Sequence, residues 1–257
     1  MTMSPTARVL VVDDDEFGTA AADVVLGLLP ADEPRLGIAT GGTPMPLYAE
    51  LARRAQRGEI DLSAAYLIAL DEYVGLGAQD CLSYSAYVHT HVAVPLGIAA
   101  DNVLVPDGLA PDPNAEAEAY EQRIDDLGGV DVQIAGIGSN GHLAFNEPGS
   151  PLDSTTRVVA LSGQTRSDNA RFFDSRSEVP HDAITQGLAT ICRARAVVLL
   201  ARGPEKAAAL AAALAGPVST EVPASVLQRH PAVTVIADRS AATELPDRLE
   251  TRARNRL

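Results

Sequence analysis

Three short apolar segments of this 257-residue chain are followed at once by residues that could bind or transform a small molecule. The first segment, Leu36–Ala39, runs into Thr40, Gly41, Gly42 and Thr43. The glycine pair lets backbone N–H groups approach a ligand. Thr43 before a proline predicts the capped start of a helix, whose N-terminus attracts anions. The segment therefore predicts a phosphate-binding loop, with a tight capped turn as the alternative. It is not a Walker A loop, because no Gly-Lys-Ser/Thr follows.

The second segment places two carboxylates, Asp71 and Glu72, directly after the apolar run Leu67–Leu70. Neighbouring side chains of an extended chain point to opposite sides, so at most one of the two can enter a given pocket. A carboxylate at a strand end, with its pKa raised by burial, could act as a general base. The alternative is a turn acid that caps the following segment.

The third segment is the glycine-rich loop Gly136–Pro148, which contains His142 and Glu147. Its glycines match G-x-G-x-x-G, but prolines interrupt any helix soon after them, and the next predicted strand is not followed by an acid. A dinucleotide site is therefore not predicted. An imidazole transfers protons near neutral pH, and a nearby carboxylate can hold it and tune its pKa. The loop is a candidate for proton transfer, and a structural histidine is the alternative.

Two cations could complete an anion site. Arg171 lies in the stretch Asn169–Asp174, and Lys206 lies near the start of a predicted helix at Pro204–Ala215. A cation at a helix N-terminus opposes the helix dipole, so helix stability alone does not favour Lys206 there. The two interpretations of Lys206 are a functional cation and a solvated surface lysine.

Short apolar runs alternate along the chain with longer amphipathic segments. The predicted strands are Arg8–Val12, Arg35–Ala39, Ala65–Leu70, Asn102–Val105, Val130–Gly136, Arg157–Leu161, Ala196–Ala201 and Val233–Ala237. Most lack polar alternation, which is typical of strands buried on both faces. The predicted helices are Asp15–Leu29, Pro44–Arg57, Ser83–Val92, Asn114–Leu127, Pro180–Cys192, Pro204–Ala215 and Thr220–Arg229.

This alternation predicts a single α/β domain over residues 1–257, with an open, mostly parallel Rossmann-like sheet and helices on both faces. In such sheets a ligand binds beyond the carboxyl ends of the strands. The three chemistry-bearing segments all follow predicted strands, so we expect them to meet there.

The chain carries a formal net charge of −14. That charge disfavours nucleic acid and anionic membranes as partners. A phosphorylated sugar would also be repelled unless a local cluster of donors and cations held it. The N-terminal residues show no apolar run with a cleavage site, and no apolar run reaches membrane-spanning length, so we expect a cytoplasmic protein. Cys81 and Cys192 fit two reduced thiols.

Taken together, these segments resemble the glucosamine-6-phosphate deaminase family. The matching stretches, in the family's order, are Thr40–Pro44, Leu70–Leu76, Ser83–Tyr84, Gly138–Pro148, Thr165–Arg166 with Asn169–Asp174, and Gly203–Ala207. The Asp-Glu-Tyr-Val-Gly and Gly-His-x-x-Phe-Asn-Glu-Pro segments are highly specific, and the Thr-Gly-Gly-Thr-Pro loop is less so. The resemblance implies an isomerising deaminase of the hydrolase class. It would convert glucosamine 6-phosphate and water to fructose 6-phosphate and ammonia, with no metal and no organic cofactor.

The resemblance also implies roles for single residues. Asp71 would move a proton between C2 and C1 of the opened sugar, and His142 would open the ring with the support of Asn140 and Glu147. The phosphate would be held by Thr40, Gly41, Gly42, Thr43, Arg171 and Lys206. Some members have Asp at position 140. An amide cannot take a proton from His142, although it can orient the ring through a hydrogen bond.

Regulation and substrate leave alternatives open. Allosterically activated members use a Lys-Thr pair after the arginine at position 157, where this chain has Val159 and Ala160. We therefore expect weak or absent activation by N-acetylglucosamine 6-phosphate, and a monomer or small homo-oligomer. The alternative functions are a galactosamine-6-phosphate deaminase, a 6-phosphogluconolactonase and a non-catalytic sugar-phosphate-binding protein. The segment after Pro148 is a candidate lid over the sugar.

Overall fold

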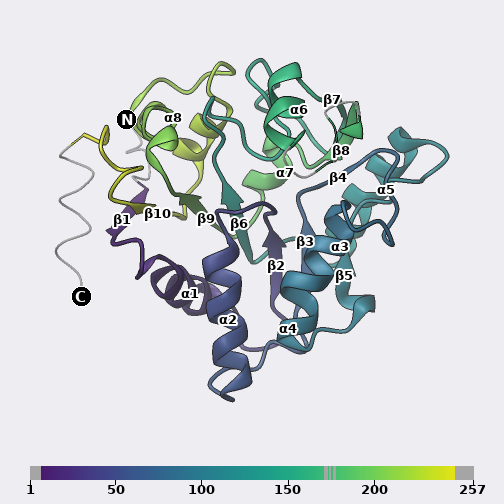
Figure 1. The fold of residues 1–257 in the computed structure, drawn as a ribbon, viewed down its shortest axis with the longest axis horizontal. Coiled ribbons are helices and arrows are strands. Elements are labelled where there is room, and N and C mark those ends of the chain that lie inside the picture. Colours follow the sequence, from purple (N-terminus) through teal and green to yellow (C-terminus); the bar gives the residue numbers. More distant parts are fainter. Residues whose placement is uncertain (1–6, 171–172, 174, 176–177, 247–257) are drawn as a thin grey trace.

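The computed structural model describes residues 7–170, 173, 175 and 178–246, and Arg171 lies outside the described residues (Figure 1). A seven-stranded sheet forms the centre, in the order β1-β10-β9-β6-β2-β3-β5. Its strands are β1 (Arg8–Val12), β2 (Arg35–Ile38), β3 (Tyr66–Ala69), β5 (Val103–Leu104), β6 (Val132–Gly136), β9 (Ala196–Ala201) and β10 (Val233–Asp238). Every neighbouring pair is parallel. The prediction of an open, mostly parallel α/β sheet is confirmed.

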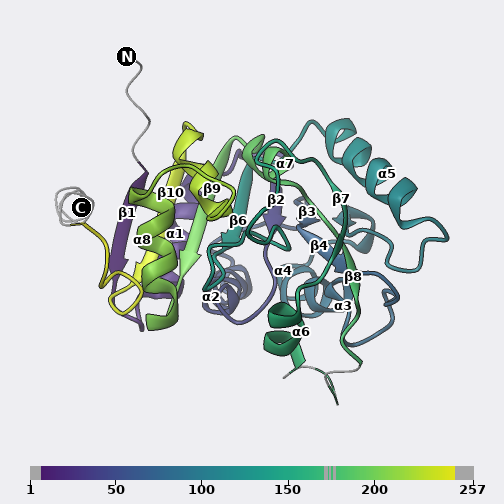
Figure 2. The same cartoon turned by 90° about the horizontal axis from the view of Figure 1, so that it is seen from above.

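Helices cover the sheet on both sides. Figure 2 shows α2 and α4 on one side of β2 and β3, and α5 and α7 on the other. The main helices are α1 (Phe17–Leu28), α2 (Met45–Gln56), α3 (Tyr84–Val88), α4 (Val94–Leu96), α5 (Pro113–Asp126), α6 (Gly163–Asn169), α7 (Leu188–Cys192) and α8 (Ala207–Ala215). Because both faces are covered, the central strand β9 is buried along its whole length, which explains its uninterrupted apolar sequence.

The order of the strands reverses between β2 and β6. From β2 the chain moves outward to β3 and β5, and from β6 it moves the other way through β9 and β10. Adjacent strands whose connections leave in opposite directions open a crevice at their carboxyl ends. The loops that follow β2 and β6 are Thr40–Thr43 and the glycine-rich loop Gly136–Pro148. The topology therefore brings the first and third chemistry-bearing segments together.

A second, three-stranded antiparallel sheet stands beside this crevice. It consists of β4 (Asp71–Tyr73), β8 (Asp182–Thr185) and β7 (Arg157–Ala160), in that order. Strands β4 and β8 were not predicted, and β7 was expected in the parallel sheet. The helix predicted at Pro180–Cys192 is wrong in its first half, because residues 182–185 pair with β4 and β7 and only α7 is helical.

The segment predicted as a helix at Thr220–Arg229 forms a 3₁₀ helix at Pro223–Arg229. Helix α6, after Pro148, was not predicted as a helix. Among the described residues, no helix is long and apolar enough to cross a membrane.

Candidate active site

A cavity of about 830 Å³ lies at the carboxyl ends of β2, β3 and β6. Seven of the residues predicted from the sequence line it: Thr40, Gly41, Gly42, Thr43, Asp71, His142 and Lys206. Strand-end segments that are far apart in the sequence thus share one cavity, as the topology requires. Asn140 and Glu147 are not among the lining residues, but both contact His142 or lie close to it.

The loop after β2 is fixed by two tyrosines beneath and beside it. Tyr48 donates a hydrogen bond to the carbonyl of Ala39 (2.7 Å), and Tyr87 donates one to the carbonyl of Gly41 (2.7 Å). Gly41 has a φ of +91°, which strongly favours glycine. The carbonyls of the two loop glycines are bound by the protein, since that of Gly42 accepts from the Met45 N–H (3.4 Å), and the backbone N–H groups of the loop are the expected contacts for an anion.

The predicted helix cap at Thr43 is wrong. The N-cap of α2 is Pro44, which makes no side-chain cap hydrogen bond. Thr43 lies before the helix and lines the cavity. Thr43 is therefore a cavity residue and not the helix cap.

Asp71 begins β4 directly after β3 and is only 5% exposed. The chain turns at this point because Gln186 holds the end of β3: its Nε2 donates to the Ala69 carbonyl (2.9 Å), and its backbone N–H donates to the Leu70 carbonyl (2.7 Å). Burial, and then the neighbouring charge of Glu72, raise the pKa of Asp71 well above its ordinary value. Asp71 is therefore a stronger base than a solvated aspartate.

Glu72 points away from the cavity, as the alternation of side chains predicts. It is 1% exposed, and its carboxylate accepts hydrogen bonds from the backbone N–H groups of Tyr73 (2.8 Å), Tyr84 (3.0 Å) and Ser85 (2.8 Å). Two of these donors open α3, so Glu72 caps that helix. Each of the two interpretations of the Asp-Glu pair therefore applies to one residue: Asp71 lies in the cavity, and Glu72 is the capping acid.

The loop after β6 presents the imidazole of His142 from a tight turn that contains Gly138 and Gly141. The Gly138 N–H donates to the His142 carbonyl (3.0 Å), and a Cβ on Gly138 would lie 2.4 Å from ring atoms of His142. Gly141 has a φ of +85°. No helix follows these glycines, which agrees with the rejection of a dinucleotide site.

Glu147 holds this loop together and faces the imidazole. Its Oε1 lies 3.7 Å from Nδ1 of His142, and its Oε2 accepts a hydrogen bond from Nδ2 of Asn140 (2.7 Å). Asn140 accepts a hydrogen bond from the backbone N–H of His142 (3.2 Å). The expectation that Asn140 orients the ring directly is therefore corrected: it fixes the backbone of His142 and the carboxylate of Glu147.

The ionisation of Glu147 is strongly favoured. Burial acts to raise its pKa, but the nearby imidazole of His142 and the hydrogen bonds from Thr165 and Asn140 outweigh burial and lower the pKa to about 2. A permanent carboxylate beside Nδ1 stabilises a protonated imidazole. The loop therefore carries the elements of a proton-transfer group, with Nε2 left for a ligand.

Lys206 ends a 3₁₀ turn (Pro204–Lys206) and is followed by α8, and its side chain reaches the cavity. It lines the cavity together with Thr40–Thr43. A cation and a glycine-rich loop that share one cavity form a plausible anion site. Nothing is described for Arg171, the second predicted cation.

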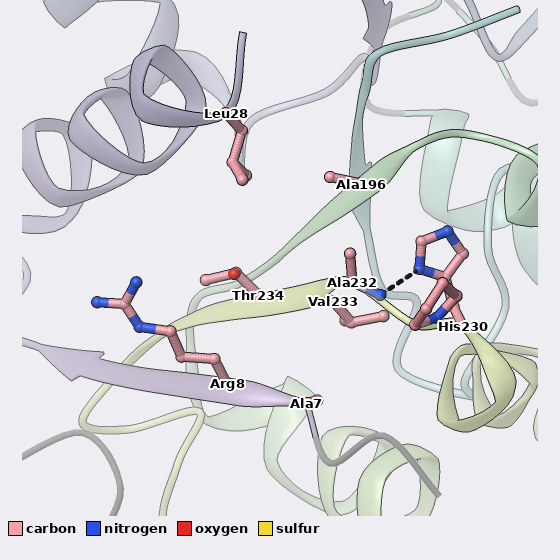
Figure 3. Close-up of a pocket in the computed structure, with 9 residues that line it drawn as sticks. Ala7, Arg8, Leu28, Ala196, His230, Ala232, Val233 and Thr234 are labelled. Atoms are coloured by element: carbon pink, nitrogen blue, oxygen red, sulfur yellow. Dashed lines mark hydrogen bonds between the residues drawn. The ribbon is translucent and has the colours of Figure 1, made fainter.

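A smaller cavity of about 250 Å³ lies at the opposite, amino ends of β1, β9 and β10 (Figure 3). Its histidine, His230, has both ring nitrogens engaged: Nδ1 accepts from the Ala232 N–H (3.0 Å), and Nε2 contacts the Ala194 carbonyl (2.8 Å). The side chain of Arg8 extends away from this histidine. No proton-transfer pair is present there, so the large cavity is the candidate active site.

The chain is similar to proteins of one family throughout its described core. The family model described as glucosamine-6-phosphate isomerases/6-phosphogluconolactonase matches residues 20–236. A glucosamine-6-phosphate deaminase of Cutibacterium acnes is 50% identical over 238 residues, which cover 92% of this chain and 91% of that protein. A glucosamine-6-phosphate deaminase of Streptomyces coelicolor is 48% identical over 239 residues, with 92% of each chain covered.

Solved structures agree with this relationship. The structure of a monomeric glucosamine-6-phosphate deaminase matches with a TM-score of 0.89 at 38% identity, over 92% of this chain and 99% of that one. A 6-phosphogluconolactonase from Trypanosoma cruzi matches with a TM-score of 0.77 at 23% identity, over 95% and 98% of the two chains, and shows a shared fold.

Proposed function

The chain belongs to the glucosamine-6-phosphate isomerase and 6-phosphogluconolactonase family, and we propose that it is a glucosamine-6-phosphate deaminase. It converts glucosamine 6-phosphate and water to fructose 6-phosphate and ammonia. The observation that carries the proposal is the placement of two separate proton-transfer groups in one cavity: Asp71 after β3 and His142, backed by Glu147, after β6. A phosphate-binding loop, Thr40–Thr43, shares that cavity.

Ring opening is the first step. His142 takes the proton of the hydroxyl on C1 and returns a proton to the ring oxygen as the bond between C1 and that oxygen breaks, which leaves an aldehyde at C1. The carboxylate of Glu147, 3.7 Å from Nδ1, stabilises the imidazolium that forms between the two transfers. Asn140 holds that carboxylate in place.

Isomerisation and deamination follow. Asp71 takes the proton from C2 and delivers it to C1, while a second proton passes from the C2 amine to the oxygen on C1. C1 is thereby reduced to the alcohol level, and the C2 amine is oxidised to an imine. Water adds to C2 to give a carbinolamine, the bond between C2 and nitrogen breaks, and ammonia leaves a ketone at C2. The atoms and electrons balance with water alone as co-reactant, so the reaction consumes no oxidant or reductant.

The phosphate is held by Thr40, Gly41, Gly42 and Thr43 with Lys206, and Arg171 belongs to the same set by resemblance. Binding energy from this remote group positions C1 and C2 against the two proton-transfer residues. The net charge of −14 makes such a local grip necessary.

The test measures ammonia and ketose 6-phosphate from glucosamine 6-phosphate and, separately, from galactosamine 6-phosphate, without added metal or nucleotide. Asp71→Asn should lower kcat by about 10²- to 10⁴-fold while the phosphosugar still binds. Asp61→Asn is the control, because Asp61 is an exposed carboxylate that accepts a hydrogen bond from the Ser63 backbone N–H and does not line the cavity.

Ammonia from galactosamine 6-phosphate alone would change the proposed substrate to that compound and leave the proposed mechanism unchanged. A folded wild-type protein that binds the sugar phosphate and releases no ammonia from either substrate would refute the deaminase proposal. Hydrolysis of 6-phosphogluconolactone would then be the next activity to measure.

A further inference from the structure

A pair of tyrosines occupies the cavity wall beside Asp71, and neither has a role in the mechanism above. Tyr73, on β4, is 2% exposed, and Tyr84 opens α3. Their rings lie 4.8 Å apart between centroids, and both residues line the cavity. The hydroxyl of Tyr84 donates a hydrogen bond to the hydroxyl of Tyr73 (3.1 Å).

A count of protons around this pair leaves one without an acceptor in the described structure. Nδ2 of Asn169, on α6, donates to the Tyr73 hydroxyl (2.8 Å), so that oxygen accepts from both Asn169 and Tyr84. Two phenols carry two protons, and the bond between them uses one. In the observed direction the free proton is that of Tyr73. If the bond between the tyrosines is reversed, Tyr84 can donate to Thr40, and the free proton passes to the Thr40 hydroxyl, which belongs to a residue that also lines the cavity.

The pair remains neutral, which keeps this proton available. Burial is the main cause of the raised pKa of both phenols, to about 12 for Tyr73 and well above its ordinary value for Tyr84. The charge of Asp71 raises the pKa of both further, and a hydrogen bond with Thr40 lowers that of Tyr84, so the pair lies near Asp71 and near the first residue of the phosphate loop.

We infer that the Tyr73–Tyr84 pair donates a hydrogen bond to the hydroxyl on C3 or C4 of the substrate. The inference rests on the proposed function, which assigns C2 to Asp71, C1 and the ring oxygen to His142, and the phosphate to Thr40–Thr43. The hydroxyls on C3 and C4 are the remaining groups between base and phosphate. The pair thereby contributes to substrate specificity by contacting a hydroxyl in the middle of the sugar chain.

The double variant Tyr73→Phe/Tyr84→Phe tests this, because each single variant still leaves one phenolic proton. The probes are 2-amino-2-deoxyglucitol 6-phosphate, an open-chain alcohol that cannot be deaminated by this route, and its 3-deoxy and 4-deoxy forms. Calorimetry gives Kd for each. We expect the double variant to bind the parent alcohol about tenfold more weakly than the wild type does. For one of the two deoxy forms, the double variant and the wild type should have nearly the same Kd.

Tyr120→Phe is the matched control. Tyr120 is also fully buried, and its hydroxyl donates to the Ala69 carbonyl (2.7 Å) at the end of β3, but it does not line the cavity. It should lose stability without a change in Kd for any probe. Thermal melts of all variants identify loss of binding that follows from loss of folding.

The outcomes separate this inference from the proposed function. Equal affinity of wild type and double variant for the parent alcohol, or an equal loss for all three probes, would overturn the inference even if the wild type releases ammonia. A selective loss in a wild-type protein that releases no ammonia would support the contact and refute the deaminase. A wild type that binds none of the probes and releases no ammonia would refute both.

Discussion

At the residue scale, the contact of His142 with Gly138 decides where the imidazole stands. A methyl group at position 138 would lie 2.4 Å from ring atoms of His142, and the atoms in its way belong to a side chain that can rotate. We therefore expect Gly138→Ala to fold and to displace the ring. A misplacement of about 1 Å can lower kcat about 100-fold, which steady-state ammonia release would measure.

Gly27→Ala is the control for this substitution. Gly27 lies in α1 and does not line the cavity, and a Cβ there meets no atom within 4 Å. A small effect on kcat at position 27 and a large one at position 138, with both variants folded, would establish that the ring position matters. Equal kcat in the two variants would show that His142 does not act from the observed position.

Glu147 makes a second residue-scale prediction, about stability and pH. Its pKa is lowered from 4.5 to about 2, so the folded protein prefers the carboxylate. A lowered pKa contributes stability that is fully present above pH 4.5 and is lost as the pH falls towards 2. The difference between these two pKa values corresponds to about 3 kcal/mol of folding free energy.

We therefore expect Glu147→Gln to lower the free energy of unfolding by up to about 3 kcal/mol at pH 7. The gap from wild type should narrow between pH 4.5 and pH 2. Urea denaturation of both proteins across that range measures it. A gap that is constant with pH would mean that the loss comes from packing or hydrogen bonds and not from ionisation.

The sequence was sufficient to predict those site residues whose own side chains line the cavity. Asp71 and His142 follow strands, and parallel strands bring their carboxyl ends together, so their convergence was predictable. The indirect roles were not. Asn140 acts on Glu147 and on a backbone N–H, and Glu72 acts on N–H groups twelve and thirteen residues away. Such contacts depend on loop conformations that no spacing in the sequence encodes.

At the element scale, buried strands were the most predictable feature. The uninterrupted apolar sequence of β9 requires cover on both faces, and the structure provides it. Strands β4 and β8 were missed because they are short and include polar residues such as Asp71 and Asp182. The apolar pattern continues into residues 188–192, which form α7. The boundary between β8 and α7 near Gly187 was therefore not evident from the sequence. There a Cβ would lie 2.1 Å from the Ser154 carbonyl oxygen.

Helix α3 makes the element-scale prediction. Five residues cannot form a stable helix alone, and Glu72 binds the N–H groups at its start. Glu72→Gln keeps the shape but has one acceptor oxygen, so a buried N–H loses its partner at a cost of about 1–3 kcal/mol. The loosened helix would displace Tyr84, so we expect a rise in KM as well as a lower melting temperature.

The pH dependence of this effect has the opposite sign to that of Glu147. Burial is the main cause of the raised pKa of Glu72, about 6, and three N–H groups oppose it. A raised pKa contributes stability that is present below pH 4.5 and is lost as the pH rises through 6. The advantage of wild type over Glu72→Gln should therefore shrink by up to about 2 kcal/mol between pH 4.5 and 7.5. An advantage that grows over this range would contradict the role of burial.

At the scale of the whole molecule, an acidic protein must bind an acidic substrate. The charge of −14 is spread over the chain, and the phosphate grip is confined to one end of the sheet. Repulsion between the protein and the substrate is screened within about 10 Å at 0.1 M salt, so attraction inside the cavity governs binding. The molecule therefore concentrates its anion-binding groups instead of balancing its overall charge.

Assembly and regulation are linked at this scale. Strand β7 carries Val159 and Ala160 where a Lys-Thr effector pair would stand, and Nη1 of Arg157 donates to Oδ1 of Asn146 (2.9 Å) inside the loop of the candidate site. Arg157 is thus engaged within its own chain, and burial lowers its pKa. The residues of β7 supply no second cation for an effector phosphate.

We therefore expect a monomer with hyperbolic kinetics. Light scattering should give the mass of one chain at micromolar concentration, and ammonia release against glucosamine 6-phosphate should follow a Hill coefficient near 1. N-acetylglucosamine 6-phosphate should leave the curve unchanged or raise KM by competition, because its only expected site is the active cavity. A sigmoidal curve that this compound makes hyperbolic would require a second site and more than one conformational state, and both the monomer and the loss of regulation would then be wrong.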